Sequence, residues 1–175
     1  FNIGIRAWEK GESDIEDHQR YRIVLDLLRR QMASLIFTKA KIDDKERVIF
    51  KGEVNSFEFT SQVSIMPTNA FGVVYVKYAV EDGDEDGQKL LAYEKNMVML
   101  DRDFGQNNFD PDDFVEFIPN ARSITFEYMR PPKEDLEEDP EWQETWDPEN
   151  EEGSPLAVKL SVVQQEDETP IVVIA

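Results

Sequence analysis

A helical hydrophobic period occurs once in this chain, near its start, and only strand-like patterns follow it. Between about residue 15 and about residue 41 the apolar side chains recur at intervals of three and four, which is the spacing of one buried helix face. They are Ile15, Tyr21, Leu25, Leu28, Met32, Leu35 and Ile36. After Asp43 and Asp44 the sequence becomes a series of short runs rich in β-branched and aromatic residues. A helix that precedes only strands has to cover its apolar face with a sheet.

The length of 175 residues and the apolar content of 40% are typical of one domain with a sizeable core. We therefore predict a single α+β domain over residues 1–175, with a helix over about 15–41 and a β-rich head over about 45–175. An acidic, glycine-containing turn at 81–88 joins two strand patterns and indicates a hairpin. The strand patterns cover residues 47–65, 71–80, 89–100, 114–118, 123–129, 156–163 and 170–175.

The charge of the chain is strongly negative but unevenly spread. A net charge of −19 argues against nucleic acid as a partner, because phosphate neutralisation dominates that kind of binding. Eleven acids and no base lie between residues 134 and 152, whereas the predicted helix is basic. A basic helix on an acidic body steers partners electrostatically. The acidic stretch either contributes to this steering or only keeps a loop solvated. From residue 20 to residue 41 the bases are Arg20, Arg22, Arg29, Arg30, Lys39 and Lys41, against Asp26 alone.

The face of the helix opposite the apolar stripe carries two aliphatic residues. At about 100° per residue, Ile23 and Leu27 point away from the core, among Arg20, Arg30 and Ser34. Scattered exposed aliphatics are normal in soluble proteins, so this placement has an ordinary alternative. We predict a partner-binding surface made of Arg20, Ile23, Leu27 and Arg30.

The sequence offers little for catalysis. It has no cysteine, which excludes disulfides and thiolate chemistry. Its one histidine, His18, lies near the start of the helix, where an ordinary surface residue is expected. The kinase-like triplet at 103–105 stands without any other kinase element. We predict that the protein is not an enzyme and that it has no catalytic residue, cofactor site or metal site.

Two motifs suggest ligands, and each has a structural alternative. Asp82, Asp84 and Asp86 followed by Gly87 match the first half of a calcium loop, but Tyr93 stands where the bidentate acid of the twelfth position belongs. We interpret this segment as a solvated hairpin tip. The tryptophans 142 and 146 either stack on sugars or pin the acidic loop to the body of the protein.

Six segments, in their order along the chain, resemble the minor pseudopilins of bacterial type II secretion systems, most closely the J class. The resemblance covers nearly the whole chain as a head without its N-terminal anchor, and the paired tryptophans are its most specific part. Pro155, which precedes Leu156 here, departs from the position of a proline in the family's late strand motif. The segments are Arg22–Met32, Phe50–Gly52, Phe57–Thr60, Ile118–Tyr128, Trp142–Trp146 and Ser154–Leu160.

The resemblance implies a pilin-like fold, with one long N-terminal helix packed on antiparallel β-sheet, and a structural role without catalysis. Its members join the I and K classes and the major pseudopilin at the tip of a short periplasmic filament that moves folded proteins across the outer membrane. We therefore expect a single-pass protein of the bacterial inner membrane, with this domain in the periplasm and membrane contact only through a helix preceding Phe1. The alternatives are a type IV pilus minor pilin and an acidic periplasmic module that binds calcium or sugar.

Overall fold

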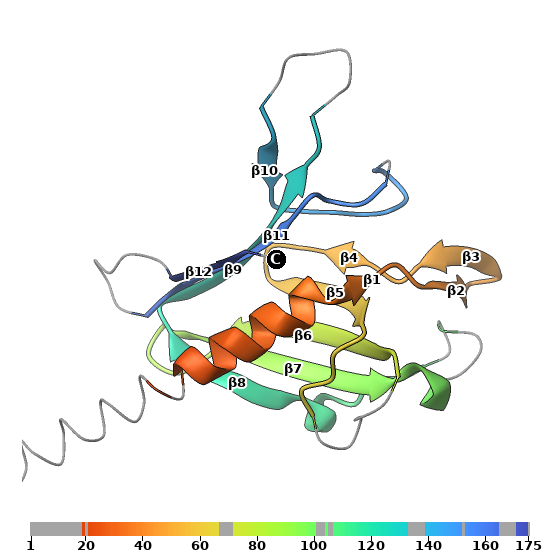
Figure 1. Ribbon diagram of the computed structural model, residues 1–175. Helices are drawn as coiled ribbons and strands as arrows, with labels where there is room; N and C mark the ends of the chain where they lie inside the picture. Colours follow the sequence, from red (N-terminus) through yellow and green to blue (C-terminus); the bar gives the residue numbers. More distant parts are fainter. Residues whose placement is uncertain are drawn as a thin grey trace, which may run out of the picture.

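The structure, a computed structural model, describes residues 19, 21–66, 72–100, 104, 107–132, 139–151, 153–164 and 171–174. Within this part the chain is helical at residue 19 and from 21 to 33, and strands dominate afterwards (Figure 1). Two short 3₁₀ turns, η2 (Met97–Met99) and η4 (Pro111–Asp113), interrupt them. The strands are β1 (Leu35–Ile36), β2 (Lys39–Ile42), β3 (Lys45–Val48), β4 (Lys51–Gly52), β5 (Ser56–Ser61), β6 (Val74–Asp82), β7 (Gln88–Asn96), β8 (Val115–Ala121), β9 (Ser123–Arg130), β10 (Glu141–Gln143), β11 (Val158–Val163) and β12 (Ile171–Ile174).

The strands form two sheets and one ribbon, all antiparallel. The first sheet has the order β1-β5-β6-β7-β8, and β4 also pairs with β5. The second sheet has the order β10-β9-β11-β12, and β2 pairs with β3 as a separate ribbon that extends away from the sheets (Figure 1). The hairpin expected around 81–88 is confirmed, because β6 and β7 pair along their whole length from Val74↔Asn96 to Asp82↔Gln88.

The predicted fold class, a pilin-like domain with one long N-terminal helix packed on a sheet, is wrong. The described chain is mostly antiparallel β-sheet and contains a single short helix. The helix predicted to reach about residue 41 ends at residue 33, and the remainder of that range forms β1 and β2. The start predicted near residue 15 lies outside the described residues.

The helix ends early because β5 supplies the hydrogen bonds that a further turn would have made. The hydroxyl of Ser61 donates to the carbonyl oxygen of Gln31 at 2.8 Å, and the amide of Gln62 donates to that of Ser34 at 3.1 Å. These contacts satisfy carbonyls that are left unpaired at the C-terminal end of any helix. Leu35 and Ile36 then continue as a strand, paired with β5.

The aspartates 43 and 44 form the tip of the ribbon and do not mark the boundary between a helix and a β domain. Both have positive φ, 53° for Asp43 and 64° for Asp44. Two-residue hairpin turns of this twist need left-handed conformations at both positions, which aspartate tolerates better than most residues. The dipeptide was therefore a turn signal within a β region.

The main hydrophobic core lies between the helix and the two sheets. The predicted helix stripe is confirmed at Tyr21, Leu25, Leu28 and Met32, which are all buried. They share one cluster with inward-facing side chains of the first sheet and of the second sheet. The sheet residues at its centre include Phe57, Phe59, Val76, Tyr78, Ile124, Phe126, Tyr128, Leu160 and Val162.

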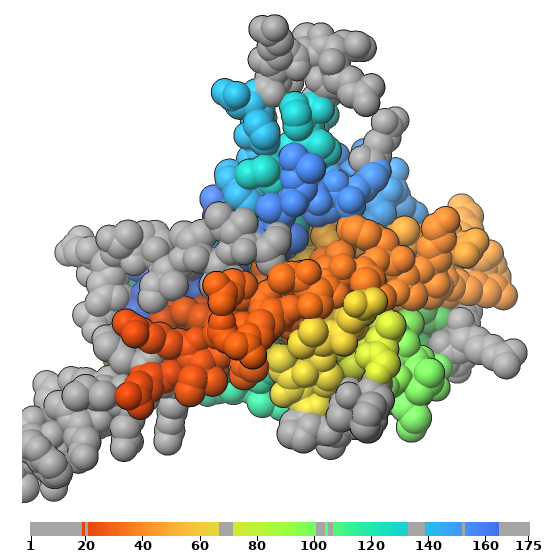
Figure 2. All heavy atoms as spheres, viewed as in Figure 1, coloured from red at the N-terminus to blue at the C-terminus, as the bar shows by residue number. Residues whose placement is uncertain are grey.

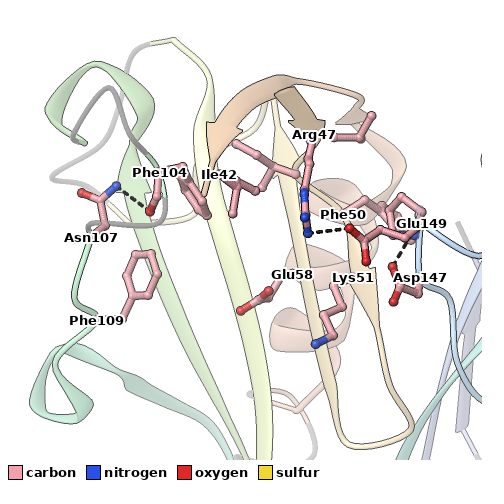
Figure 3. A pocket seen from close by; sticks show the side chains of 13 residues that line it. Ile42, Arg47, Phe50, Lys51, Glu58, Phe104, Asn107, Phe109, Asp147 and Glu149 are labelled. Carbon is pink, nitrogen blue, oxygen red and sulfur yellow. Dashed lines mark hydrogen bonds and ion pairs between the residues drawn. The ribbon is translucent and has the colours of Figure 1, made fainter. Parts of the chain in front are cut away.

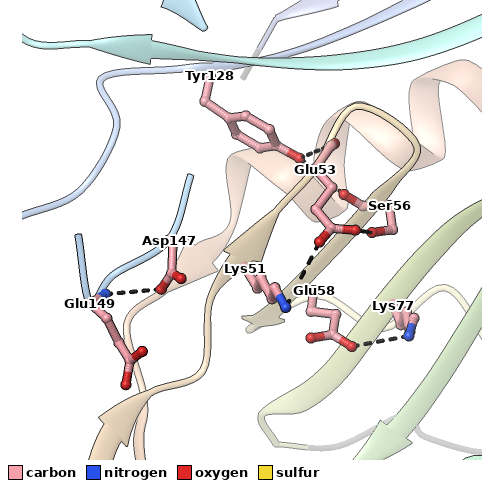
Figure 4. Close-up of polar contacts among 8 residues, drawn as sticks. All are labelled: Lys51, Glu53, Ser56, Glu58, Lys77, Tyr128, Asp147 and Glu149. Atoms are coloured by element: carbon pink, nitrogen blue, oxygen red, sulfur yellow. Dashed lines mark hydrogen bonds and ion pairs between the residues drawn. The ribbon is translucent and has the colours of Figure 1, made fainter. Parts of the chain in front are cut away.

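The two sheets are fastened together at the turn between β4 and β5. The backbone of Gly52 exchanges two hydrogen bonds of 2.8 Å with Trp146, and a Cβ on Gly52 would lie 2.2 Å from the ring of Tyr128. The Tyr128 hydroxyl lies 2.9 Å from the carbonyl oxygen of Glu53 and 3.1 Å from that of Ser56, so it donates within this turn (Figure 4). Glycine is required at position 52 because the Tyr128 ring occupies the space of a side chain.

A smaller cluster covers the opposite face of the first sheet. Its buried members are Ile49, Tyr75 and Tyr93. Tyr75 on β6 and Tyr93 on β7 point away from the main core because strand residues alternate between the two faces. The segment after β7 supplies the cover: Phe109 stacks on Tyr75 with ring centres 4.9 Å apart. Among the residues that the structure describes, no helix has the length and apolar character needed to span a membrane.

Candidate partner-binding surface

The outward face of the helix holds three of the four residues predicted to bind a partner. Ile23 is 60% exposed, Leu27 is partly buried, and Arg30 is exposed. Arg20 lies outside the described residues. The helix and the β2–β3 ribbon form one band across the face seen in Figure 2, where they appear in red to orange.

Ion pairs fix part of this helix surface. Asp26 accepts from Arg29 at 2.6 Å and from Arg30 at 3.0 Å. Such exposed pairs contribute little stability, at about 0–1 kcal/mol, but they hold both guanidinium groups at Asp26. Arg22, next to Ile23, has no ion-pair partner among the described residues. The surface therefore combines aliphatic groups with cations in a chain whose net charge is −19.

A buried polar network, which the sequence analysis missed, holds the other side of the helix. The Gln31 side chain donates to Glu94 at 2.7 Å and accepts from the Tyr78 hydroxyl at 2.5 Å. Burial, and then the nearby Glu94 carboxylate, raise the pKa of Tyr78 well above its usual value, so the hydroxyl stays protonated and can donate. Gln31 follows Leu28 by three positions and so lies on the apolar stripe of the helix. This position was the sequence feature that could have predicted its burial.

The Glu94 carboxylate extends this network to the loop after β5. Besides Gln31, it accepts from the backbone amide of Ile65 at 3.0 Å and from the hydroxyl of Ser64. A buried carboxylate is tolerated when several donors satisfy it, as here. The network ties the helix, β6, β7 and the loop together, so the helix presents its outer face from a fixed position.

Two of the hollows beside the ribbon have Pro148 in their lining. The larger, of about 350 Å³, has Ile42, Phe104 and Phe109 on one side and charged residues, among them Arg47 and Glu149, on the other (Figure 3). In it, Arg47 pairs with Glu149 at 2.6 Å and so connects the ribbon to the loop after Trp146. The smaller hollow has a volume of about 270 Å³, and both hollows share Val48, Phe50 and Pro148.

The two tryptophans of the acidic segment have different surroundings. Trp146 is buried in the main core, so it pins the loop to the body of the protein. Trp142 in β10 is partly exposed, and the ammonium group of Lys159 lies 4.3 Å from its ring centre, which is cation–π distance. Of the pair that was considered for sugar stacking, only Trp142 has an exposed ring.

The aspartates of the calcium-like motif occupy the exposed tip of the β6–β7 hairpin. The turn is closed by the amide of Gly83 donating to the carbonyl of Gly87 at 2.8 Å, and Glu85 and Asp86 have positive φ. Among the described residues no group of three His, Cys, Asp or Glu side chains is placed to hold a metal ion. His18 and the aspartate of the 103–105 triplet lie outside the described residues.

We expect calcium titration of the wild-type protein to show no site in the micromolar range at this tip. The reason is the absence of a bidentate acid at the twelfth position of the motif, where Tyr93 stands. Isothermal calorimetry with calcium chloride measures this, with Asp84→Ala as the comparison. A micromolar site that Asp84→Ala abolishes would contradict the prediction.

Comparisons of the chain with protein-family models, with curated proteins and with solved structures find no match.

Proposed function

We propose that this protein is a structural assembly subunit at the tip of a type II secretion pseudopilus, where it supports export of folded proteins across the outer membrane. Its partners would be the minor pseudopilins of the I and K classes and the major pseudopilin. The domain would then lie in the periplasm, anchored to the inner membrane by a helix preceding Phe1. The protein would act through contacts with these subunits and not through catalysis.

The resemblance of the ordered segments supports this proposal, independently of the long helix that was wrongly expected. Several of these segments supply the residues that join the two sheets: Gly52, Tyr128 and Trp146. One of the paired tryptophans, Trp146, is therefore a residue that the fold needs, and together with Gly52 and Tyr128 it gives an assembly subunit a stable body. The type IV pilus minor pilin is the alternative within the same class, and no observation on the described residues favours it.

The exposure of Ile23 is the observation that carries the assembly role. A large aliphatic side chain that is 60% exposed, beside Leu27 and among arginines, offers apolar area that a partner can bury, and arginine is enriched in protein interfaces. Burying such an aliphatic side chain at an interface is worth about 1.5–3 kcal/mol. The arginines would meet acidic groups on the neighbouring subunit and orient it.

We expect the double variant Ile23→Asp/Leu27→Asp to remain folded and to lose binding to the cognate minor pseudopilins. Two carboxylates would replace the apolar contact and would face the acids that the arginines attract. Binding is measured by pull-down and by titration with the purified I- and K-class subunits.

A matched control comes from another exposed apolar pair. Val98 and Met99 on η2 are 85% and 71% exposed, and the variant Val98→Asp/Met99→Asp introduces the same charge on a different element. This control should bind like the wild type. If the helix variant also binds normally, the proposed interface is incorrect; if wild-type protein binds neither subunit, the proposed function fails.

A further inference from the structure

The smaller hollow beside Pro148 has aromatic walls and an open mouth. Phe50 and Trp146 form its inner wall, and both are buried. Phe37, at the mouth, is 49% exposed although its ring lies only 5.7 Å from that of Phe50. Gly153 and Ser154 line the opposite side, where small side chains leave the entrance free.

The inner wall of this hollow is held in place by contacts with the rest of the fold. Trp146 is held by its paired backbone hydrogen bonds to Gly52, and Phe50 packs edge-on against Phe57 with ring centres 5.2 Å apart. A preformed pocket orders few groups on binding, so little of the binding free energy is lost to reorganisation. An aromatic pocket of this kind is the usual seat of an anchor residue in a protein interface.

The loop that borders the hollow is acidic. Residues 139–151 carry six acids and no base. Of these acids, Glu151 lines the hollow, and it accepts from Gln143 at 3.0 Å through one carboxylate oxygen. Glu149, two residues away, lines the larger hollow instead and pairs with Arg47 at 2.6 Å. Glu151 therefore places a carboxylate at the hollow, on an acidic loop, where it is complementary to a cation.

We propose that this hollow binds a peptide segment of a partner protein through one large apolar side chain flanked by basic residues. The apolar side chain would enter between Phe37, Phe50 and Trp146, and a neighbouring base would reach Glu151. This gives the acidic segment a binding role that a merely solvated loop does not have. The surface is distinct from the outer helix face, whose cations call for an acidic partner group.

The probe for this inference is a labelled pentapeptide with a central phenylalanine and two lysines on each side, titrated by fluorescence anisotropy into the full chain. A peptide with alanine at the centre measures attraction by charge alone, and one with glutamates in place of the lysines reverses the charge. We expect the phenylalanine–lysine peptide to bind at least about fivefold more tightly than the alanine peptide, because a hot-spot aromatic contributes more than about 1 kcal/mol. It should also bind more tightly than the glutamate peptide, because the bordering loop is acidic. Equal binding of the alanine and phenylalanine peptides would overturn the proposal.

Variants assign the binding to this hollow. Phe37→Ala and Ser154→Trp should each weaken the phenylalanine–lysine peptide at least about fivefold, the first by removing a wall and the second by filling the space. Glu151→Gln should weaken it and reduce its dependence on salt. Val98→Ala, at a distant exposed apolar residue, is the control and should leave binding unchanged.

Nuclear magnetic resonance separates a pocket contact from diffuse attraction without a variant. The peptide should shift the indole N–H signal of Trp146, and an unchanged signal at saturation would refute the assignment. The result does not depend on the test of Ile23 and Leu27. Failure of the peptide experiment leaves the proposed assembly role standing, and failure of the pull-down leaves the hollow to be judged on its own data.

Discussion

Replacing Trp146 by alanine is expected to lower the free energy of unfolding by about 3–5 kcal/mol, which is the usual cost of removing a buried large aromatic side chain. Trp146 is almost fully buried, belongs to the main core, and brings the loop after β10 onto Gly52 of β4. Its removal leaves a cavity at the point where the two sheets meet. Urea denaturation followed by circular dichroism measures the change.

The other tryptophan of the pair provides the control. Trp142 is partly exposed on β10, and its described ring contact is with Lys159. Trp142→Ala should therefore lower the stability by only about 0.5–1 kcal/mol, as expected for an exposed cation–π contact. Equal losses for the two variants would contradict the position of Trp146 in the core.

Leu28→Ala is expected to lower the free energy of unfolding by about 2–5 kcal/mol through lost burial and the cavity that remains. Leu28 is fully buried, and it packs in the cluster that the helix shares with both sheets. Ile23→Ala on the same helix is the matched comparison, because Ile23 is 60% exposed. That surface change should stay within about 0.5 kcal/mol. An unchanged denaturation midpoint for Leu28→Ala would contradict the packing of the helix.

The sequence predicted elements correctly where one period dominated over several turns or strands. The helix stripe at Leu25, Leu28 and Met32 and the strand at β9 follow from such patterns. The long helix was predicted wrongly because Leu35 and Ile36 satisfy a helical period and also suit a strand. The pairing of these residues with β5 decides in favour of a strand, and a local hydrophobic period carries no information on such a long-range contact.

The two candidate surfaces also differ in whether the local sequence could predict them. The outward direction of Ile23 follows from its angular position on a helix, so periodicity predicted it and the structure agrees. The hollow beside Pro148 joins Phe37, Phe50 and Trp146, which lie far apart in the chain. Its existence depends on how the ribbon, β4 and the loop after β10 meet, and no short motif predicts that meeting. The same applies to the contact of Gln31 with Glu94, although each residue is visible as a polar group in an apolar pattern.

The hydrogen bonds that join the β4–β5 turn to Tyr128 and Trp146 also determine when this protein can finish folding. Tyr128 reaches back 75 residues to the carbonyl of Glu53, and Trp146 reaches further still to Gly52. Closing such long loops precedes the stabilisation that the contacts provide, so folds rich in them form slowly. During synthesis the first half of the chain therefore exposes Phe50 and Phe57 until β9 and the Trp146 loop have been made. Such exposed aromatic side chains favour aggregation of the nascent chain. The native fold can form only after the C-terminal half of the chain has emerged.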